Sequence, residues 1–251
     1  MKYFISSRII NILILIFFFS SISFAGNPSD NKGVLRVVFK HFANGKEIVL
    51  RDSFYTNSSG ETYSIKKLRY YVSNIKVGNS TFKNDEQNYH LIDLKGPTTF
   101  DLPLDAGIYN SFDFLLGVDS LRNCSGSQTG ALDPVKDMFW TWNSGYVVFK
   151  LEGTSSSSTA DLNRIEHHIG GYRFGNNVST NISLKVFPNN IVINKEKLTE
   201  ILIYVDLDKY WYSTNQISIA DDPMCTLPGE LAKKIALNFP NLFSVKSIKL
   251  L

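Results

Sequence analysis

Histidine, cysteine and methionine are the side chains that bind transition metals best, and this 251-residue sequence contains four, two and three of them. Imidazole and thioether groups together suit copper better than calcium or magnesium. We take His168, His90 and Met138 as candidate copper ligands. His167 is adjacent to His168, so on a strand the two point to opposite faces and at most one serves a given site. Ordinary core packing is the alternative, since methionine also fills irregular gaps in cores.

Trp140 and Trp142 form a second candidate group because they are separated by one residue and face the same side of an extended chain. They lie between a stretch rich in Gly, Ser and Asp-Pro (123–134) and an apolar, strand-like run (146–151). Functional side chains are often mounted where such a loop re-enters a sheet. The pair has three open interpretations, namely core aromatics, a surface that stacks on sugars, and a target for oxidation.

The common catalytic signatures are absent from the sequence. It has no Gly-x-Ser-x-Gly, no His-Glu-x-x-His, no phosphate-binding glycine loop and no Cys-x-x-Cys. Asp119, Asp133 and Glu152 could supply acid–base chemistry, but carboxylates in turn-rich sequence usually accept turn hydrogen bonds. We therefore expect a protein that is not an enzyme.

The first 25 residues predict export. Lys2 and Arg8 precede an apolar run (9–19), and Ser23-Phe24-Ala25 provides the small residues that a signal peptidase needs. Residues 1–25 are therefore expected to be a signal peptide, and the mature protein to be periplasmic, extracellular or on the cell surface. No later stretch is apolar for long enough to predict a membrane span. Removal of Lys2 and Arg8 lowers the formal charge from +3 to +1, which argues against nucleic acid as a partner.

Cys124 and Cys225 are the two cysteines. In an exported protein an isolated pair most often forms a structural disulfide, which is our prediction here. Free thiols and copper ligands are the alternatives.

Alternating apolar and polar residues predict strands along most of the chain. One face of residues 34–41 presents Leu35, Val37 and Phe39, and Asn44-Gly45 is a typical hairpin turn. One clear helix is expected, at 227–239. The pattern predicts an all-β fold, an antiparallel two-layer β-sandwich with one C-terminal helix, in a single domain over residues 34–246.

Several longer motifs resemble those of the MbnP-like proteins, a family of exported bacterial proteins linked by name to methanobactin operons and related to copper-binding surface proteins. The motifs occur in the same order over nearly the whole mature chain: LRYYVSNIKV (68–77), LGVDS (116–120), GALDP (130–134), MFWTWNSGY (138–146), KLEG (150–153), HIGGY (168–172) and NFPNLFSV (238–245).

The resemblance implies a copper site of unusual composition. In related copper-binding members, a dihaem partner enzyme oxidises a tryptophan to kynurenine, and histidines hold copper together with that kynurenine. The matching residues here are Trp140 or Trp142 and His168. Many members also keep histidines in a C-terminal His-Val-His, where this chain has Ser247-Ile248-Lys249, so a second histidine ligand is not assigned.

Two functions from different classes follow. The first is an exported, non-enzymatic copper-binding protein with a possible oxidised-tryptophan site. The second is a metal-free interaction module that binds carbohydrate or a partner protein through an aromatic loop containing Trp140, Trp142 and Tyr146.

Overall fold

The apolar alternation seen in the sequence becomes strands with one buried face. The computed structural model describes residues 31–81, 88–126, 128–141, 143–186 and 188–251, so the predicted signal peptide and Trp142 lie outside the described residues. In strand β1 (Lys32–Ala43), Leu35, Val37 and Phe39 are buried, as the alternation predicts. Asn44 and Gly45 both have positive φ and turn the chain into the short strand β2 (Lys46–Glu47).

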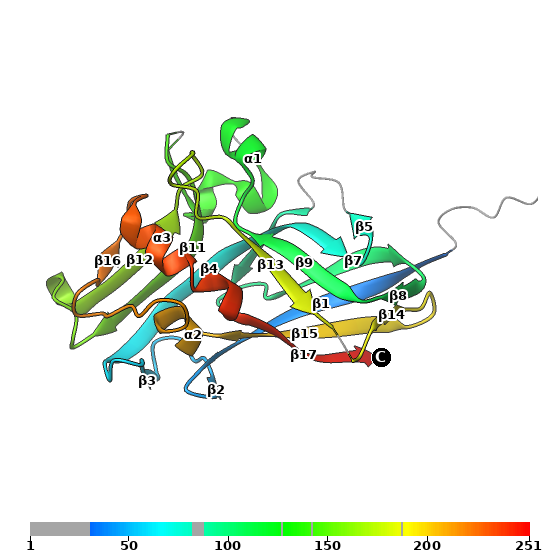
Figure 1. Cartoon of the computed structure of the whole chain (residues 1–251), viewed down its shortest axis with the longest axis horizontal. Coiled ribbons are helices and arrows are strands. Elements are labelled where there is room, and N and C mark those ends of the chain that lie inside the picture. Colours follow the sequence, from blue (N-terminus) through cyan, green and yellow to red (C-terminus); the bar gives the residue numbers. More distant parts are fainter. Residues whose placement is uncertain (1–30, 82–87, 127, 142, 187) are drawn as a thin grey trace, which may run out of the picture. The chain divides into compact units, whose positions relative to one another are not determined.

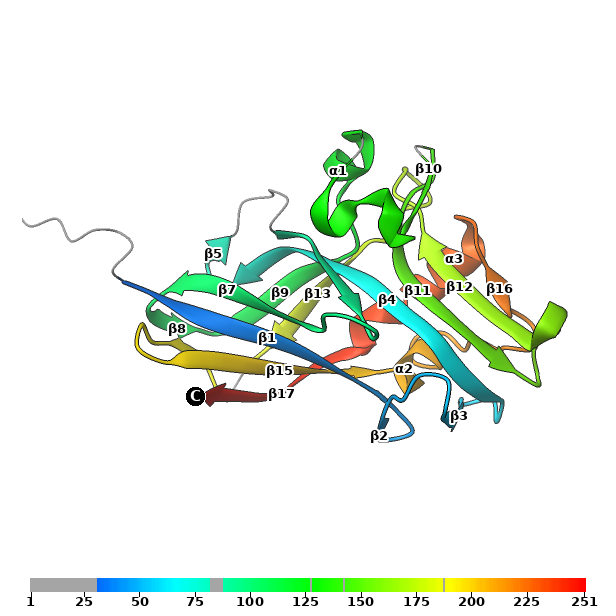
Figure 2. The same cartoon turned by 180° about the vertical axis from the view of Figure 1, so that it is seen from behind.

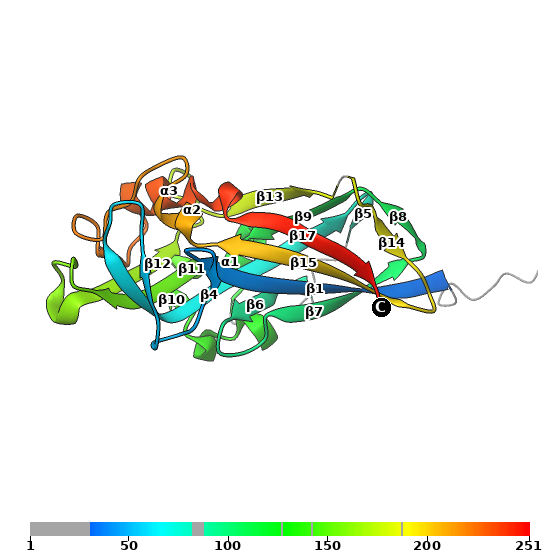
Figure 3. The ribbon, with the colours of Figure 1, turned by 90° about the horizontal axis from the view of Figure 1, so that it is seen from below.

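One sheet is built around β1. Its neighbours are β2, β7 (Thr99–Asp105) and β15 (Leu198–Asp206), and β17 (Phe243–Leu250) pairs with the far side of β15. Figure 3 shows β7, β1, β15 and β17 side by side. β1 and β15 run parallel, with Val34 opposite Leu198 and Phe42 opposite Asp206. The β-rich fold is thus confirmed, but the prediction of purely antiparallel strands is wrong.

A larger sheet is built around the long strand β4 (Thr62–Val77) and is seen from both sides in Figures 1 and 2. A further short pair joins β8 and β14. The remaining strands are β3 (Phe54–Thr56), β5 (Ser80–Thr81), β6 (His90–Asp93), β8 (Gly107–Tyr109), β9 (Ser111–Leu116), β10 (Phe139–Thr141), β11 (Gly145–Ser155), β12 (Arg164–Gly170), β13 (Thr180–Lys185), β14 (Ile191–Ile193) and β16 (Met224–Cys225).

The two large sheets share one hydrophobic core, which we call the first core. Phe39 of β1 packs edge-to-face against Tyr70 of β4 and Phe114 of β9, with ring centroids 6.0 and 6.1 Å apart. Tyr70 also stacks on Phe149 of β11 at 5.5 Å. Because aromatic pairs bury large areas, these contacts fix the two sheets against each other.

The predicted helix is shorter than expected. Helix α3 covers Glu230–Ala236 and buries Ala232 and Ile235, while Phe239–Asn241 forms a 3₁₀ turn. Pro240 contributes to this end, because it has no backbone N–H to donate to the Ala236 carbonyl, so the α-helical hydrogen-bond pattern cannot continue. The chain then continues into β17, so α3 is not the C-terminal element. Two shorter helices are α1 (Ser120–Cys124) and α2 (Asp208–Trp211). No helix in the described part of the chain has the length and apolar character to cross a bilayer.

The segment from Val118 to Ser144, which we call the central loop, covers part of the larger sheet and is joined to it by β10, which pairs with β11. It contains α1, two 3₁₀ turns and β10, and Figure 2 shows α1 and β10 above β4 and β11. A second, smaller core lies beneath it, formed by Tyr71, Tyr89, Val118, Leu132, Met138, Tyr146 and Val147. The loop is therefore anchored by its own buried side chains and can position groups on the sheet.

Candidate functional site

Two of the four histidines, His41 and His167, are buried in the protein interior. His41 Nε2 shares a 2.9 Å hydrogen bond with the Tyr70 hydroxyl, and burial lowers the pKa of His41 to about 3. His167 Nε2 donates to the carbonyl of Asp222 at 2.7 Å, so its Nδ1 accepts from the Tyr210 hydroxyl, also at 2.7 Å. Burial lowers the pKa of His167 to about 4. Both are neutral core residues; His167 has both ring nitrogens in hydrogen bonds, and His41 has its Nε2 in one.

His168 lies on the other face of β12, as its adjacency to His167 requires. Its Nε2 is 3.0 Å from Glu152 Oε1 and 4.0 Å from Glu166 Oε1, and its side chain is 14% exposed. The strand register produces this arrangement, since Lys150 lies opposite His168 and Glu152 lies opposite Glu166. The imidazole therefore sits between two carboxylates, within reach of solvent.

Two lysines complete this charged group. Lys67 Nζ lies 3.1 Å from carboxylate oxygens of both Glu152 and Asp137. Lys150 is only 3% exposed, and its Nζ lies 3.0 Å from Asp137 Oδ2. The hydrogen bond from His168, followed by that from Lys67, lowers the pKa of Glu152 to about 2 although burial opposes the shift. Glu152 is therefore a fixed negative charge beside His168.

Trp140 is positioned on the same face of β12. The side chains at 168 and 170 point the same way along a strand, and Gly170 has no side chain. An added Cβ at Gly170 would lie 2.7 Å from Cζ3 and 3.0 Å from Cη2 of Trp140. The indole ring thus covers Gly170, two residues along the strand from His168. Trp142 cannot be placed, because it lies outside the described residues.

Substitution of Gly170 by Ala should move the Trp140 ring. The new methyl group would also meet the Tyr146 carbonyl oxygen at 3.0 Å, so we expect a loss of about 1–3 kcal/mol in the free energy of unfolding. The Trp140 indole N–H signal should shift in a ¹H–¹⁵N spectrum. Gly96→Ala is a matched control, since its Cβ would have only ordinary contacts at 3.7 Å or more. Equal effects of the two substitutions would argue against this placement of Trp140.

Met138 and Tyr146 are interior residues. Met138 is 0% exposed in the second core. Tyr146 is 3% exposed, and its hydroxyl donates to the Leu132 carbonyl at 2.7 Å. The structure therefore gives Met138 the packing role that methionine often has, and it removes Tyr146 from the predicted aromatic contact surface.

His90 lies at a different edge of the larger sheet. Its ring stacks on Phe100 of β7, with centroids 3.7 Å apart and planes 5° apart. Burial lowers the pKa of His90 to about 4. The four strands β6, β4, β11 and β12 lie next to one another in that order where Arg69 of β4 pairs with its neighbours. His90 and His168 are thus separated by at least three strand spacings, more than about 14 Å, and cannot bind the same ion.

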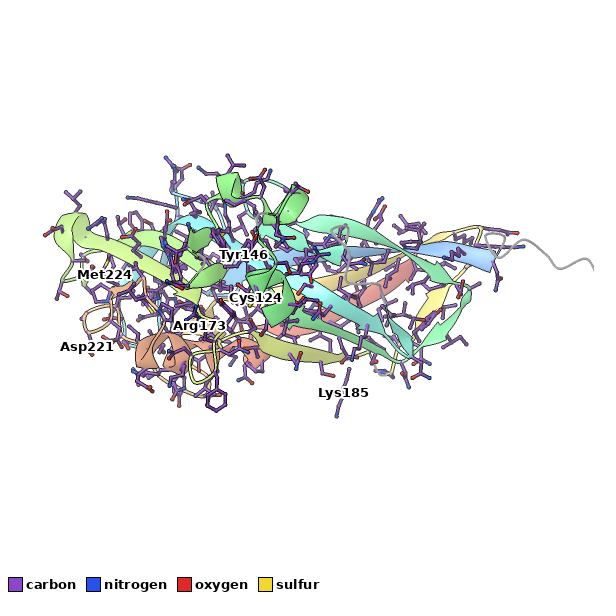
Figure 4. All side chains as sticks on the ribbon, turned by 90° about the horizontal axis from the view of Figure 1, so that it is seen from above. Cys124, Tyr146, Arg173, Lys185, Asp221 and Met224 are labelled. Atoms are coloured by element: carbon purple, nitrogen blue, oxygen red, sulfur yellow. The ribbon has the colours of Figure 1, made fainter. Side chains whose placement is uncertain are left out.

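The predicted disulfide is wrong, since both cysteines are free. Cys225 is buried in the first core beside β12, whereas Cys124 is exposed at the end of α1. Figure 4 shows Met224, the neighbour of Cys225, well away from Cys124. Burial raises the pKa of Cys225 to about 12, so it is not a thiolate at neutral pH and is a poor metal ligand.

The carboxylates considered for acid–base chemistry divide into two kinds. Asp119 caps α1 by accepting from the Arg122 N–H, and Asp133 accepts from the Val135 N–H, so both have the expected turn role. Glu152 instead pairs with His168. The sequence did contain a signal for this pair, because the spacing of Lys150 and Glu152 on one strand matches that of His168 and Glu166 on the next. The pairing register was needed to recognise it.

Comparison with known proteins agrees with the family resemblance of the sequence motifs. A family model described as MbnP matches residues 32–227. The solved structure of MbnP from Methylosinus trichosporium is similar with a TM-score of 0.53 and 14% sequence identity, over 77% of this chain and 83% of that one. No curated protein matches the chain. Since the family model covers most of the chain, including the strands and loop that carry His168 and Trp140, the chain belongs to the MbnP family.

Proposed function

We propose that this MbnP-family chain is an exported, non-enzymatic copper-binding protein whose ion is held beside β12 by His168. The observation that carries the proposal is the location of His168 on an outward face, two residues from the glycine that Trp140 covers. His41 and His167 are engaged in the core, and His90 lies three strands away. His168 is thus the histidine that fits a site next to the part of the chain that contains Trp140 and Trp142, which we call the tryptophan segment.

The donor set beside β12 suits copper only in part. It offers one imidazole with Glu152 and Glu166, and imidazole is a good copper ligand. Among the described residues, no group of three or more His, Cys, Asp or Glu side chains is arranged to hold a metal ion. We infer that a further ligand comes from Trp140 or Trp142, after oxidation to kynurenine by a dihaem partner protein. With dioxygen or a peroxide as the oxidant, the C2–C3 bond of the indole is cleaved, and hydrolysis then releases the C2 carbon as formate. Bound copper would then be held by an imidazole and by the aromatic amine or ketone of the kynurenine side chain.

Export supports this function. The predicted signal peptide, residues 1–25, would deliver the chain to the periplasm or the cell surface, where a cell first meets copper. The MbnP family name links such proteins to methanobactin operons.

A metal-free interaction module is the second candidate, and the exposed loop at 172–178 favours it. Phe174 in this loop is fully exposed. Arg173 holds the loop next to the tryptophan segment through a 3.0 Å bond from Nη2 to Asn143 Oδ1. Exposed aromatic rings on loops are common in contact surfaces. This surface borders the proposed copper site, so a partner protein docked there would approach Trp140.

Copper titration of the purified mature protein tests the proposal. His168→Ala should weaken copper binding by at least about 10-fold, since loss of an imidazole ligand removes a main donor. His90→Ala is the matched control and should leave the affinity unchanged, because His90 is more than about 14 Å away. Circular dichroism would show that both variants are folded. Equal affinities for the parent protein and His168→Ala would exclude His168 as a ligand and favour the interaction module.

A further inference from the structure

A cleft of about 560 Å³ lies at the β6 edge of the larger sheet, away from His168. Its floor includes Arg69, His90 and Leu91, and its walls include Phe100 from β7 and Val135 and Lys136 from the central loop. Small-molecule sites in proteins usually have volumes of about 300–1,000 Å³. The cleft is thus of a size for a small organic ligand.

The cleft combines apolar walls with a net positive charge. Val135 is 80% exposed, and Leu91 and Phe100 are partly buried. Arg69 lies 2.8 Å from Asp93, so these two charges offset each other. Lys136 is exposed and, among the described residues, has no acidic partner within ion-pair distance. Lys136 therefore leaves one unbalanced positive charge at the mouth of the cleft.

The cleft is rigidly held at its charged end. Arg69 Nη1 donates to the Lys136 carbonyl at 2.9 Å, which joins the central loop to β4. His90 stacks on Phe100, and its buried Nε2 has no hydrogen-bond partner within the described residues. A metal ion does not suit this place, because His90 is a single imidazole and Asp93 is already paired with Arg69. A buried polar atom without a partner is uncommon in a site that serves packing alone.

We propose that this cleft binds a small organic anion with an apolar, preferably aromatic, body. The anionic group would face Lys136 and Arg69, and the apolar body would cover Val135, Leu91 and Phe100. This site is separate from the proposed copper site, and neither claim depends on the other.

The test uses naphthalene-2-carboxylate as the probe and the neutral 2-naphthamide as its matched analogue, titrated into the metal-free mature protein by NMR. We expect saturable binding of the carboxylate, accompanied by shifts of the His90 ring signals. The amide should bind about two- to five-fold more weakly than the carboxylate. Lys136→Gln should weaken carboxylate binding by a similar factor without affecting the amide. Val135→Ser should weaken the binding of both.

Two controls separate the alternatives. Lys95→Gln removes an exposed lysine of the neighbouring turn that does not line the cleft, and it should leave both affinities unchanged. His168→Ala should bind the carboxylate like the parent protein, which separates this result from that of the copper titration. No saturable binding at millimolar probe, equal affinities for acid and amide, or no effect of Lys136→Gln and Val135→Ser would each overturn the proposal.

Discussion

Lowering the pH from about 7 to about 5 should reduce the free energy of unfolding by about 6 kcal/mol. His41, His90 and His167 all have pKa values lowered by burial, to about 3, 4 and 4. In the unfolded chain their pKa returns to about 6.5, so that state binds more protons as the pH falls. Their contribution is fully present above about pH 6.5 and is lost toward the folded pKa values. Each histidine accounts for about 2 kcal/mol of the loss by pH 5.

Urea unfolding at the two pH values measures this effect. Replacing one of the three histidines, for example in His167→Asn, should reduce the difference between the two pH values by about 2 kcal/mol, whatever the substitution does to stability at pH 7. Staying above pH 5 keeps the titration of carboxylates such as Glu152 small. A pH dependence that is the same in the parent protein and all three variants would contradict the assignment.

Replacing Glu61 by Ala should lower the free energy of unfolding by about 3–5 kcal/mol. The Glu61 carboxylate accepts from the backbone N–H groups of Ile219 (2.7 Å) and Ala220 (2.8 Å) and from the Ser218 hydroxyl (3.1 Å). Ala would leave the buried Ile219 N–H and the two partly buried donors without this acceptor. The segment they belong to leads into β16, which pairs with β12, so the edge of the proposed copper site should loosen as well.

Glu61→Gln is the matched control, because its amide keeps one acceptor oxygen. We expect a loss of about 1–2 kcal/mol for this variant. Chemical denaturation gives both values, and hydrogen exchange at Ile219 and Ala220 should rise most in Glu61→Ala. If the two variants were as stable as the parent protein, the carboxylate would not be what holds this segment.

Local pattern predicted most of the strands but not how they pair. The buried faces of β1, β4 and β15 follow from alternation, which depends only on residues close in sequence. The parallel pairing of β1 with β15 joins residues such as Val34 and Leu198, which are far apart in the chain. Period-two alternation contains no information about strand direction. Strand β7, which brings Phe100 against His90, was not predicted either.

The sequence indicated only some features of the candidate site. Motif resemblance identified His168 and Trp140, and the structure places them on one face of β12. Sequence could not show that Met138 is fully buried, or that Cys124 and Cys225 lie in different surroundings. These properties depend on how the central loop folds over β11. The pairing of His168 with Glu152 depends on the register of β11 and β12.

Metal analysis of the mature protein from its native host, combined with a peptide mass map of the segment around Trp140 and Trp142, tests the central claim most directly. We expect about one copper ion per chain and the mass of kynurenine in place of one tryptophan. The His168→Ala protein from the same host should contain little copper while remaining folded. Protein that contains no copper and two unmodified tryptophans, or a His168→Ala variant that keeps its copper, would contradict it.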